Sequence, residues 1–212
     1  MGMTNSPRET EAAQRRERRD SIENRQRILT VARQLFAERG VEATSMNDIA
    51  QVARLGPGTL YRHFAHKGEL CEALMAEDIA AFWERVDTTL AHSREPALNQ
   101  LGWLIDQLLQ MTESHVPLLA AIQLPHIGSA ELFQGPFYGI LHTRVSSLLT
   151  AALAQGEVEN LDAVFTADVI LAAMAPPLFS FQRTGRHLSL EQISTGMRRL
   201  LVDGLRVHAG ER

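Results

Sequence analysis

Between residues 22 and 64 the sequence alternates short amphipathic stretches with glycine and proline breaks, and this spacing limits the fold more than any other feature. The first stretch has apolar residues three and four positions apart, at Ile28, Leu29, Ala32, Leu35 and Phe36. That spacing gives one apolar face on an α-helix, and a glycine such as Gly40 is a residue at which helices commonly end. We therefore expect a helix over about residues 22–39.

Two further signals divide the segment that follows. Ser45 and Asp48 have the spacing of a capping box, which predicts the start of a second helix of about two turns. The run GPG at 56–58 then breaks the chain, and a third short helix begins over residues 59–64. Two short helices joined by a tight turn form a helix-turn-helix, whose second helix is suited to the major groove of DNA.

The third helix has one apolar side and one side rich in polar groups. Leu60 and Phe64 lie four residues apart and point inward. The residues left outward or on the flanks are Gly58, Thr59, Arg62, Tyr61 and His63. Gly58 has no Cβ to obstruct a phosphate that approaches the first turn of the helix, and the helix dipole attracts anions there. Hydroxyl, imidazole and ammonium donors at Tyr61, His63 and Lys67 could reach neighbouring phosphates.

The rest of the chain also follows helical periodicity, and no stretch alternates in the manner of a strand. We expect further helices over about residues 68–92, 98–113, 116–124, 135–155, 161–183 and 189–208. Ser189 and Gln192 resemble a second capping box, and Pro176-Pro177 should kink or interrupt the helix that contains them. The expected fold is all-α, with an N-terminal three-helix DNA-binding domain and a larger helical domain. The expected boundaries are a disordered basic arm at 1–20, the helix-turn-helix domain at 21–67 and the helical domain at 68–212.

Charge is distributed unevenly along the chain. Residues 1–70 carry an excess of three positive charges and residues 71–212 an excess of seven negative charges, which together give the net charge of -4. The front half of the chain is therefore the half that attracts polyanions. The arm at 1–20 contains Arg15, Arg16, Arg18 and Arg19. It is either a solvated tail or an arm that reaches DNA phosphates or a minor groove.

The run ATSMNDIAQVARLGPGTLYRHFAHKGEL, residues 43–70, resembles the DNA-binding signature of the TetR family of bacterial repressors. With the preceding amphipathic helix, the resemblance covers about residues 22–75. It implies phosphate contacts from Thr44, Ser45, Tyr61, His63 and Lys67, and close approach of the backbone at Gly58. It also implies base or groove contacts from Asn47, Pro57 and Thr59, and Arg62 either reads a base as well or faces solvent.

Three positions depart from the family pattern. Arg54 stands where the family usually has a glycine, so a left-handed backbone there would cost about 1 kcal/mol unless the turn differs. Gly56 replaces the usual serine cap, a change that costs only a few tenths of a kcal/mol. Asn47 stands where many relatives carry an arginine that reads guanine, and asparagine favours adenine or a water-mediated contact. The operator sequence therefore does not follow from the resemblance.

The resemblance further implies that the larger domain binds a small-molecule effector and forms a homodimer on a palindromic operator in double-stranded DNA. Apolar stripes at Leu171, Met174, Leu178 and Phe181 and at Met197, Leu200, Leu201 and Leu205 suit a four-helix dimer interface, although an intramolecular core would look similar. Aromatic and polar residues suit a pocket for an apolar or aromatic effector, at Trp103, Gln107, Met111, His115, Phe133, Phe137, Tyr138, His142 and Phe179. Taken singly, each of these is also an ordinary core residue.

Other functional classes find little support in the sequence. Motifs of metalloproteases, serine hydrolases and P-loop enzymes are absent, so we expect no enzyme, no metal site and no cofactor. The single cysteine, Cys71, and the lack of a secretory signal or an unbroken apolar span indicate a cytoplasmic protein without a membrane segment. One alternative keeps the DNA-binding head but has the large domain bind a protein partner, and an activator in place of a repressor also stays open.

Overall fold

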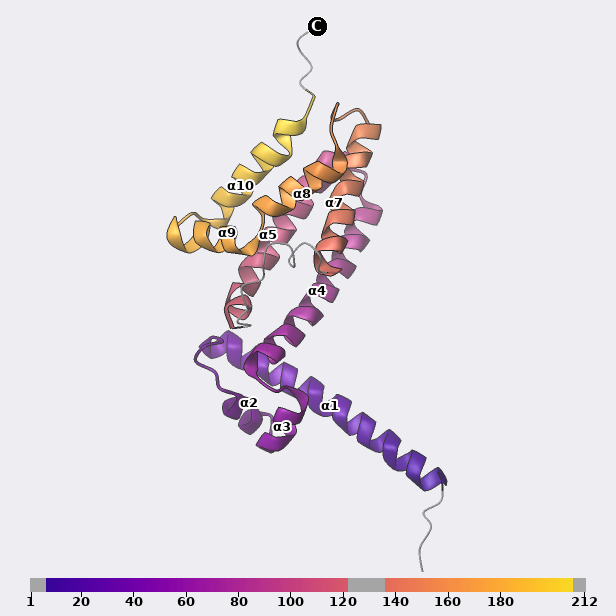
Figure 1. Ribbon diagram of the computed structural model, residues 1–212, viewed down its shortest axis with the longest axis vertical. Coiled ribbons are helices and arrows are strands. Elements are labelled where there is room, and N and C mark those ends of the chain that lie inside the picture. Colours follow the sequence, from indigo (N-terminus) through magenta and orange to yellow (C-terminus); the bar gives the residue numbers. More distant parts are fainter. Residues whose placement is uncertain (1–6, 122–135, 208–212) are drawn as a thin grey trace, which may run out of the picture. The chain divides into compact units, whose positions relative to one another are not determined.

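The computed structural model describes residues 7–121 and 136–207, and every regular element in these two ranges is helical (Figure 1). The all-α class expected from the sequence is confirmed. The α-helices are α1 (Pro7–Arg39), α2 (Met46–Val52), α3 (Pro57–His63), α4 (Lys67–His92), α5 (Ala97–Ala121), α7 (Pro136–Ala154), α8 (Ala163–Ala173), α9 (Pro176–Ser180) and α10 (Leu190–Leu201). A π-helical turn, η1 (Phe181–Gly185), follows α9, and a 3₁₀ turn, η2 (Asp203–Leu205), follows α10.

The described part of the chain forms two compact units, which divide inside α4 between Asp78 and Ile79. The first unit holds α1 to α3, the first half of α4, and the end of α5 from Pro117. The second holds the rest of α4 and α5 together with α7 to α10. The boundary expected at residue 67 therefore differs from the observed division by about three turns of helix, because the first half of α4 supplies apolar residues to the first core.

The core of the first unit explains its three-helix arrangement. One apolar face of α1 packs on residues from α2, α3 and the start of α4, with the fully buried side chains Ile28, Leu29, Ile49, Leu60, Phe64, Leu70 and Leu74. Arg33 of α1 also forms ion pairs with Asp78 at 2.6 Å and Glu77 at 3.5 Å on α4. Burial of one such side chain stabilises the fold by about 1.5–3 kcal/mol, so the spacing of apolar residues, more than local propensity, fixes the unit.

Helix α1 is longer than the sequence led us to expect. It begins at Pro7, so residues 7–20 are helical and not the disordered arm that we expected. Residues 1–6 lie outside the described residues. The helical start has a physical reason, since arginine, glutamate, glutamine and alanine are good helix formers and proline is favoured at a first helical position. Arg19 and Glu23 add an ion pair of 2.9 Å between successive turns.

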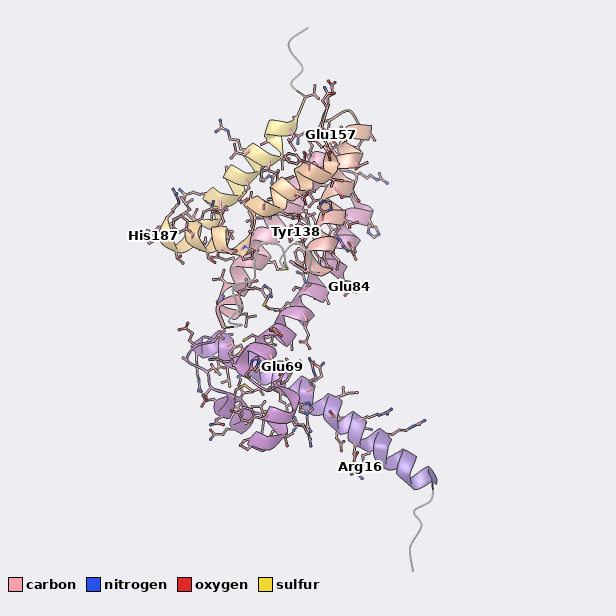
Figure 2. All side chains as sticks on the ribbon, viewed as in Figure 1. Arg16, Glu69, Glu84, Tyr138, Glu157 and His187 are labelled. Atoms are coloured by element: carbon pink, nitrogen blue, oxygen red, sulfur yellow. The ribbon has the colours of Figure 1, made fainter. Side chains whose placement is uncertain are left out.

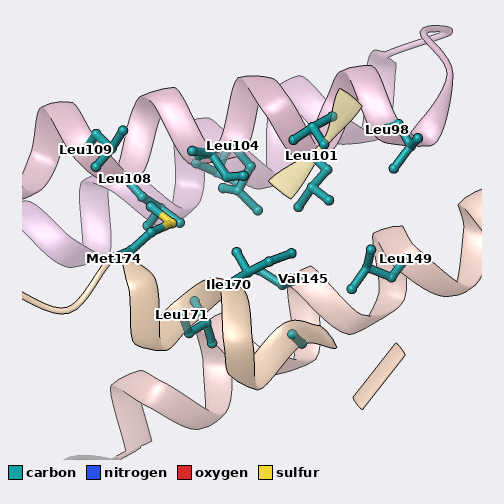
Figure 3. Packing of buried hydrophobic residues seen from close by; sticks show 14 of the residues in the cluster. Leu98, Leu101, Leu104, Leu108, Leu109, Val145, Leu149, Ile170, Leu171 and Met174 are labelled. Carbon is teal, nitrogen blue, oxygen red and sulfur yellow. The ribbon is translucent and has the colours of Figure 1, made fainter. Parts of the chain in front are cut away.

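The second unit has its own core, which lies between α5, α7 and α8 (Figure 3). Leu101 and Leu104 of α5, Val145 and Leu149 of α7 and Ile170 of α8 are all at most 1% exposed. Helix α10 closes this unit by packing Ile193 against the same cluster. Phe82 and Val86 of α4 and Phe179 of α9 complete the cluster, so apolar side chains from six helices hold the unit together.

Three helices of the second unit differ in extent from those expected. The expected helices at 98–113 and 116–124 are one helix, α5, which continues through Pro117 to Ala121. The segment expected as one helix over 161–183 breaks after Ala173, as Pro176-Pro177 predicted. Helix α10 has the predicted capping box but ends at Leu201, because the backbone at Val202 leaves the helical region.

Candidate nucleic-acid interface

The first helix of the helix-turn-helix, α2, starts as the sequence predicted. The Ser45 side chain accepts a hydrogen bond from the Asp48 backbone amide at 3.2 Å, and the Ser45 amide donates to Asp48 Oδ2 at 2.8 Å. The Ser45 hydroxyl also donates to Asp48 Oδ2, and these bonds hold the pKa of the Asp48 carboxyl below its usual value. Ser45 is exposed, but its hydroxyl already has a partner, so a phosphate would have to compete with Asp48.

The turn between α2 and α3 has the left-handed backbone that the family pattern implies. Arg54 has φ of 55°, a region in which a residue with a Cβ costs about 1–2 kcal/mol. Gly40, which follows α1, has φ of 85°, and a glycine adopts this conformation without steric cost because it has no Cβ. The turn thus keeps the shape usually made with glycine although arginine occupies it.

Helix α3 presents its polar side to solvent. Leu60 and Phe64 are 0% and 2% exposed, which confirms the inward side expected for this helix. Pro57, Gly58, Tyr61 and Arg62 are exposed, and Thr59 is half-buried. Asn47 on α2 is also exposed. These six residues of the expected contact set are therefore available on the surface, either fully or in part.

Nothing in the first unit requires a glycine at position 58. A Cβ built there would meet no atom within 4 Å, and the residue has an ordinary helical φ. The absence of an internal reason is consistent with an external one, such as a backbone that must approach another molecule closely. Pro57 at the first helical position favours the start of α3, and the extended backbone at Phe64 ends the helix.

Two residues of the expected contact set have internal roles in the structure. Thr44 is 1% exposed, and its hydroxyl donates to the Gly40 carbonyl at 2.8 Å. The Lys67 ammonium donates to the backbone carbonyls of Val41 at 2.8 Å and Thr44 at 3.1 Å. Both residues therefore hold the connection between α1 and α2, and their assignment as phosphate contacts stays a prediction in which DNA would compete with these internal partners. Three donors on one ammonium suit it to bind several carbonyls that follow a helix end.

His63 is a weaker phosphate ligand than its place in the motif implied. Its Nε2 atom is buried and has no hydrogen-bond partner among the described residues. Burial lowers the pKa of His63, and the nearby charges of Arg62 and Arg25 lower it further. The ring is therefore neutral at pH 7, and it adds no positive charge to the surface. Arg25, which the sequence argument missed, lies with its guanidinium 5.2 Å from the centre of the Phe64 ring.

The residues expected to line an effector pocket come from α5, α7 and α9, except Phe133, which lies outside the described residues. Phe179 is fully buried in the second core, and four others pack against that core as half-buried residues, namely Trp103, Met111, Phe137 and Tyr138. Gln107 is half-buried on the same helix as Trp103. His115 is 7% exposed, and its Nδ1 lies 2.7 Å from the Met111 carbonyl. A pocket formed by these residues stays a prediction.

Tyr138 and His142 lie together on α7, as their spacing predicted, with ring centres 6.0 Å apart. The hydroxyl of Tyr138, which is labelled in Figure 2, donates to Asp168 of α8, and His142 Nε2 lies 3.4 Å from the same carboxylate. Burial and this hydrogen bond raise the pKa of Tyr138 to about 12. Spacing along the sequence does not indicate Asp168, because the pairing depends on the packing of α7 against α8.

A second aromatic group in this unit was also missed. Trp83 of α4 is 8% exposed, and its ring lies 4.9 Å from Phe82 and 6.2 Å from Phe137, measured between ring centres. The Arg144 guanidinium lies 4.2 Å above the Trp83 ring and pairs with Asp87 at 2.7 Å. The Trp83 Nε1 atom is buried and donates to no acceptor among the described residues. A cluster of aromatic rings therefore lies between α4 and α7, and the Trp83 indole N–H in it has no acceptor among the described residues.

Known proteins resemble this chain both in sequence and in fold. Residues 28–74 match the bacterial regulatory proteins of the tetR family. An HTH-type transcriptional regulator of Staphylococcus aureus strain bovine RF122 is 31% identical over 186 residues, which are 88% of this chain and 96% of that protein. A namesake from S. aureus strain MRSA252 is 32% identical over 189 residues, with the same coverage of each chain.

Two solved structures illustrate the similarity of fold. A TetR-family transcriptional regulator from Pectobacterium atrosepticum matches with a TM-score of 0.68 and 26% identity, over 90% of this chain and 98% of that one. Thermus thermophilus FadR, a TetR-family repressor in complex with lauroyl-CoA, matches with a TM-score of 0.62 and 21% identity, over 89% and 98% of the two chains. The similarity thus extends across both units and is not confined to the helix-turn-helix.

Proposed function

Because the chain belongs to the TetR family of bacterial regulatory proteins, and is thus a DNA-binding transcriptional regulator, we propose that it represses transcription as a homodimer on a palindromic operator. We further propose that a small apolar or aromatic effector releases it from the operator. The proposal joins three parts, which are the DNA-contacting surface, the dimer and the effector site. Each has its own support in the structure.

The exposed side of α3 is the observation that carries the DNA-binding part. Pro57, Gly58, Tyr61 and Arg62 are exposed there, and the space in front of Gly58 is open. A helix that enters a major groove needs such a side, with polar groups for base edges and phosphates and no bulky atom where the backbone comes close. Thr59 and Asn47 are the candidates for base contacts, and Tyr61 and Arg62 for phosphate or groove contacts.

Exposed apolar side chains on the C-terminal helices support the dimer. Phe165 is 66% exposed and Val169 is 43% exposed on one side of α8, and Leu200 of α10 is 73% exposed. Leu178 and Phe181, near α9, are 41% and 52% exposed. Large apolar surfaces of this kind usually mark an interface with another molecule. We propose that a second copy of the chain covers them.

The apolar composition of residues 163–185 also supports a dimer interface. Residues Ala163–Gly185 are long and apolar enough to cross a membrane by length and hydropathy alone. Only 28% of the most apolar 18-residue stretch within them is buried inside this chain. The helix is broken before Pro176. In a family of DNA-binding regulators, an interface between two protomers explains this exposed apolar segment without a bilayer.

A cluster of aromatic side chains in the second unit supports the effector part. Trp83 is 8% exposed and lies beside Phe137, Phe137 and Tyr138 pack half-buried against the same core, and the buried Trp83 indole N–H has no acceptor among the described residues. Apolar walls with a few directed polar groups are typical of small-molecule sites. The similar fold of Thermus thermophilus FadR holds lauroyl-CoA, a ligand with one apolar acyl chain, and this supports an apolar part in the proposed effector. An effector releases DNA if it binds more tightly to the state that does not fit the operator, with typical coupling of about 1–3 kcal/mol.

Selection of bound duplexes from a random-sequence pool by the purified protein tests the proposal. We expect a two-fold symmetric motif whose half-sites lie about one duplex turn apart, or a multiple of it, since a dimer places two copies of α3. The binding stoichiometry on the selected duplex, measured by sedimentation, should be two protomers or a multiple of two. Enrichment of no motif, or of an asymmetric motif bound by one protomer, would contradict the proposal.

A further inference from the structure

Residues 15–19 of α1 hold four arginines and one glutamate, and none of them belongs to the core of the first unit. Among residues 15–39 of α1 the buried side chains begin at Ile28, whereas Arg15, Arg16 and Arg18 are exposed. Figure 1 shows α1 continuing past α2 and α3 at its N-terminal end, and Figure 2 marks Arg16 on that part of the helix. Packing within the first unit therefore does not account for these arginines.

Arg25 fixes which side of this helical extension is directed toward α3. Its guanidinium lies 5.2 Å from the centre of the Phe64 ring, and Phe64 is the residue that caps the C-terminal end of α3. Arg18 precedes Arg25 by seven residues, or about two helical turns, so both lie on the same side of α1. Arg15 lies one further turn away, on the flank of that side. A line of arginines thus leads outward from the end of α3.

Between residues 15 and 25 of α1, the acidic residues lie on other sides of the helix. At about 100° per residue, Glu17, Asp20 and Glu23 are each about 100° or more away from Arg18 around the helix. Glu23 is paired with Arg19 at 2.9 Å, whereas neither Arg18 nor Arg15 has an ion pair with a described side chain. The side that continues from α3 is therefore basic, and the opposite side is mixed in charge.

The electrostatics at the end of α3 agree with this arrangement. The charges of Arg62 and Arg25 both act to lower the pKa of His63, after the larger effect of burial. Arg62 and Phe64 flank His63 in the sequence, and the Arg25 guanidinium lies 5.2 Å from the centre of the Phe64 ring. Arg62 and Arg25 are therefore both near the C-terminal end of α3.

The helix sets the reach of this surface. Arg18 and Arg15 lie about 10 and 15 Å from Arg25 along α1, which corresponds to about three and four base pairs of duplex. We propose that Arg15 and Arg18 bind phosphates of the duplex that flanks the contact site of α3. Duplex DNA is the partner that fits, because it presents about one negative charge per 1.7 Å along its axis. This inference rests on the proposed function of the helix-turn-helix.

A comparison of two duplexes tests the inference. The first is the shortest selected duplex that the wild-type protein binds, and the second is the same duplex with eight arbitrary base pairs added at each end. The variant Arg15→Ala/Arg18→Ala removes the proposed contacts. The matched control Arg16→Ala/Arg27→Ala removes the same charge from exposed residues on the opposite side of α1. Affinity is measured for each pair from 50 to 300 mM salt.

We expect the wild-type protein to have a steeper salt dependence on the extended duplex than on the short one. Each phosphate contact adds about 0.9 to the slope of log K against log salt, so four contacts in a dimer add about 3.6. The Arg15→Ala/Arg18→Ala variant should lose this difference and bind the short duplex as the wild-type protein does. The control variant should keep it. Helical content and thermal midpoint should match those of the wild-type protein in both variants, because the four arginines are exposed.

Three results would overturn the inference. One is an unchanged slope for Arg15→Ala/Arg18→Ala on the extended duplex while the short duplex is bound normally, which leaves the proposed function intact. Another is an equal loss of affinity in the control variant, which would indicate a general effect of charge. The third is failure of the wild-type protein to bind any selected duplex, which would remove the proposed function as well.

Discussion

Replacement of Gly58 by alanine separates a role in folding from a role in DNA binding. The structure leaves room for the added methyl group, since a Cβ at position 58 meets no atom within 4 Å. Alanine is a better helix former than glycine by about 0.5–1 kcal/mol, and position 58 lies in the first turn of α3. We therefore expect Gly58→Ala to raise the thermal midpoint by about 1–4 °C.

The same substitution should weaken operator binding. A methyl group in front of the first turn of α3 would hold a phosphate away from the backbone, and a hydrogen bond to a charged group contributes about 1.5–3 kcal/mol. This loss corresponds to a decrease in affinity of about tenfold to a hundredfold for each half-site. Fluorescence anisotropy with a selected duplex measures the affinity, and circular dichroism measures the thermal midpoint.

Gly139 offers a matched control on α7. It is exposed and helical, and a Cβ there also meets no atom within 4 Å. Gly139→Ala should raise the thermal midpoint in the same way and leave operator affinity unchanged. A Gly58→Ala protein that is more stable and binds the operator as tightly as the wild-type protein would refute the assignment of this surface to DNA.

Four further predictions follow from particular residues. Arg54→Gly removes the cost of a left-handed backbone with φ of 55° and should stabilise the protein by up to about 1 kcal/mol in chemical denaturation, with operator binding retained. Lys67→Met removes the ammonium that binds the carbonyls between α1 and α2, and should destabilise the fold by about 1–3 kcal/mol in the same assay. Phe165→Asp places a charge on the exposed side of α8 and should shift the protein from dimer to monomer in sedimentation, and an unchanged dimer would contradict the proposed interface. The hydrogen bond from Arg183 lowers the pKa of the Glu113 carboxyl from its ordinary value of 4.5. The stability that this bond contributes is therefore present above pH 4.5 and is lost as the pH falls through the lowered pKa. The difference in thermal midpoint between the wild-type protein and Glu113→Gln should shrink as the pH falls from 7 to 3.

The local signals of the sequence predicted the DNA-binding unit well. Ser45 with Asp48 and Ser189 with Gln192 form the capping boxes that their spacing indicated. Leu60 and Phe64 are buried as their periodicity required. Such signals depend on residues three or four positions apart, which share a helical turn whatever the rest of the fold does. The helix starts and the inward side of α3 therefore follow from the sequence alone.

Contacts between distant segments could not be predicted in this way. Lys67 binds carbonyls 23 to 26 residues earlier in the chain, and Tyr138 binds Asp168, 30 residues later. In both cases the partner is set by the packing of helices and not by spacing along the sequence. The residues that resemble family contact positions can then have internal partners, as Thr44 and Lys67 do.

The apolar stripes on the C-terminal helices also show that spacing alone does not tell which side of a helix is internal. Leu171 and Met174, expected in an interface, are each 7% exposed and belong to the second core, whereas Phe165 and Val169 on the same helix are exposed. Helix α8 is apolar around most of its circumference, so periodicity does not tell which side is internal. Only the positions of α5 and α7 decide it.

Methylation interference on a selected duplex tests the central claim most directly, because dimethyl sulfate modifies guanine N7 in the major groove and adenine N3 in the minor groove. If the exposed side of α3 enters the major groove in each of two protomers, guanine N7 methylation should block binding at two symmetric clusters about one duplex turn apart. Interference confined to adenine N3, or a single cluster without symmetry, would contradict the account.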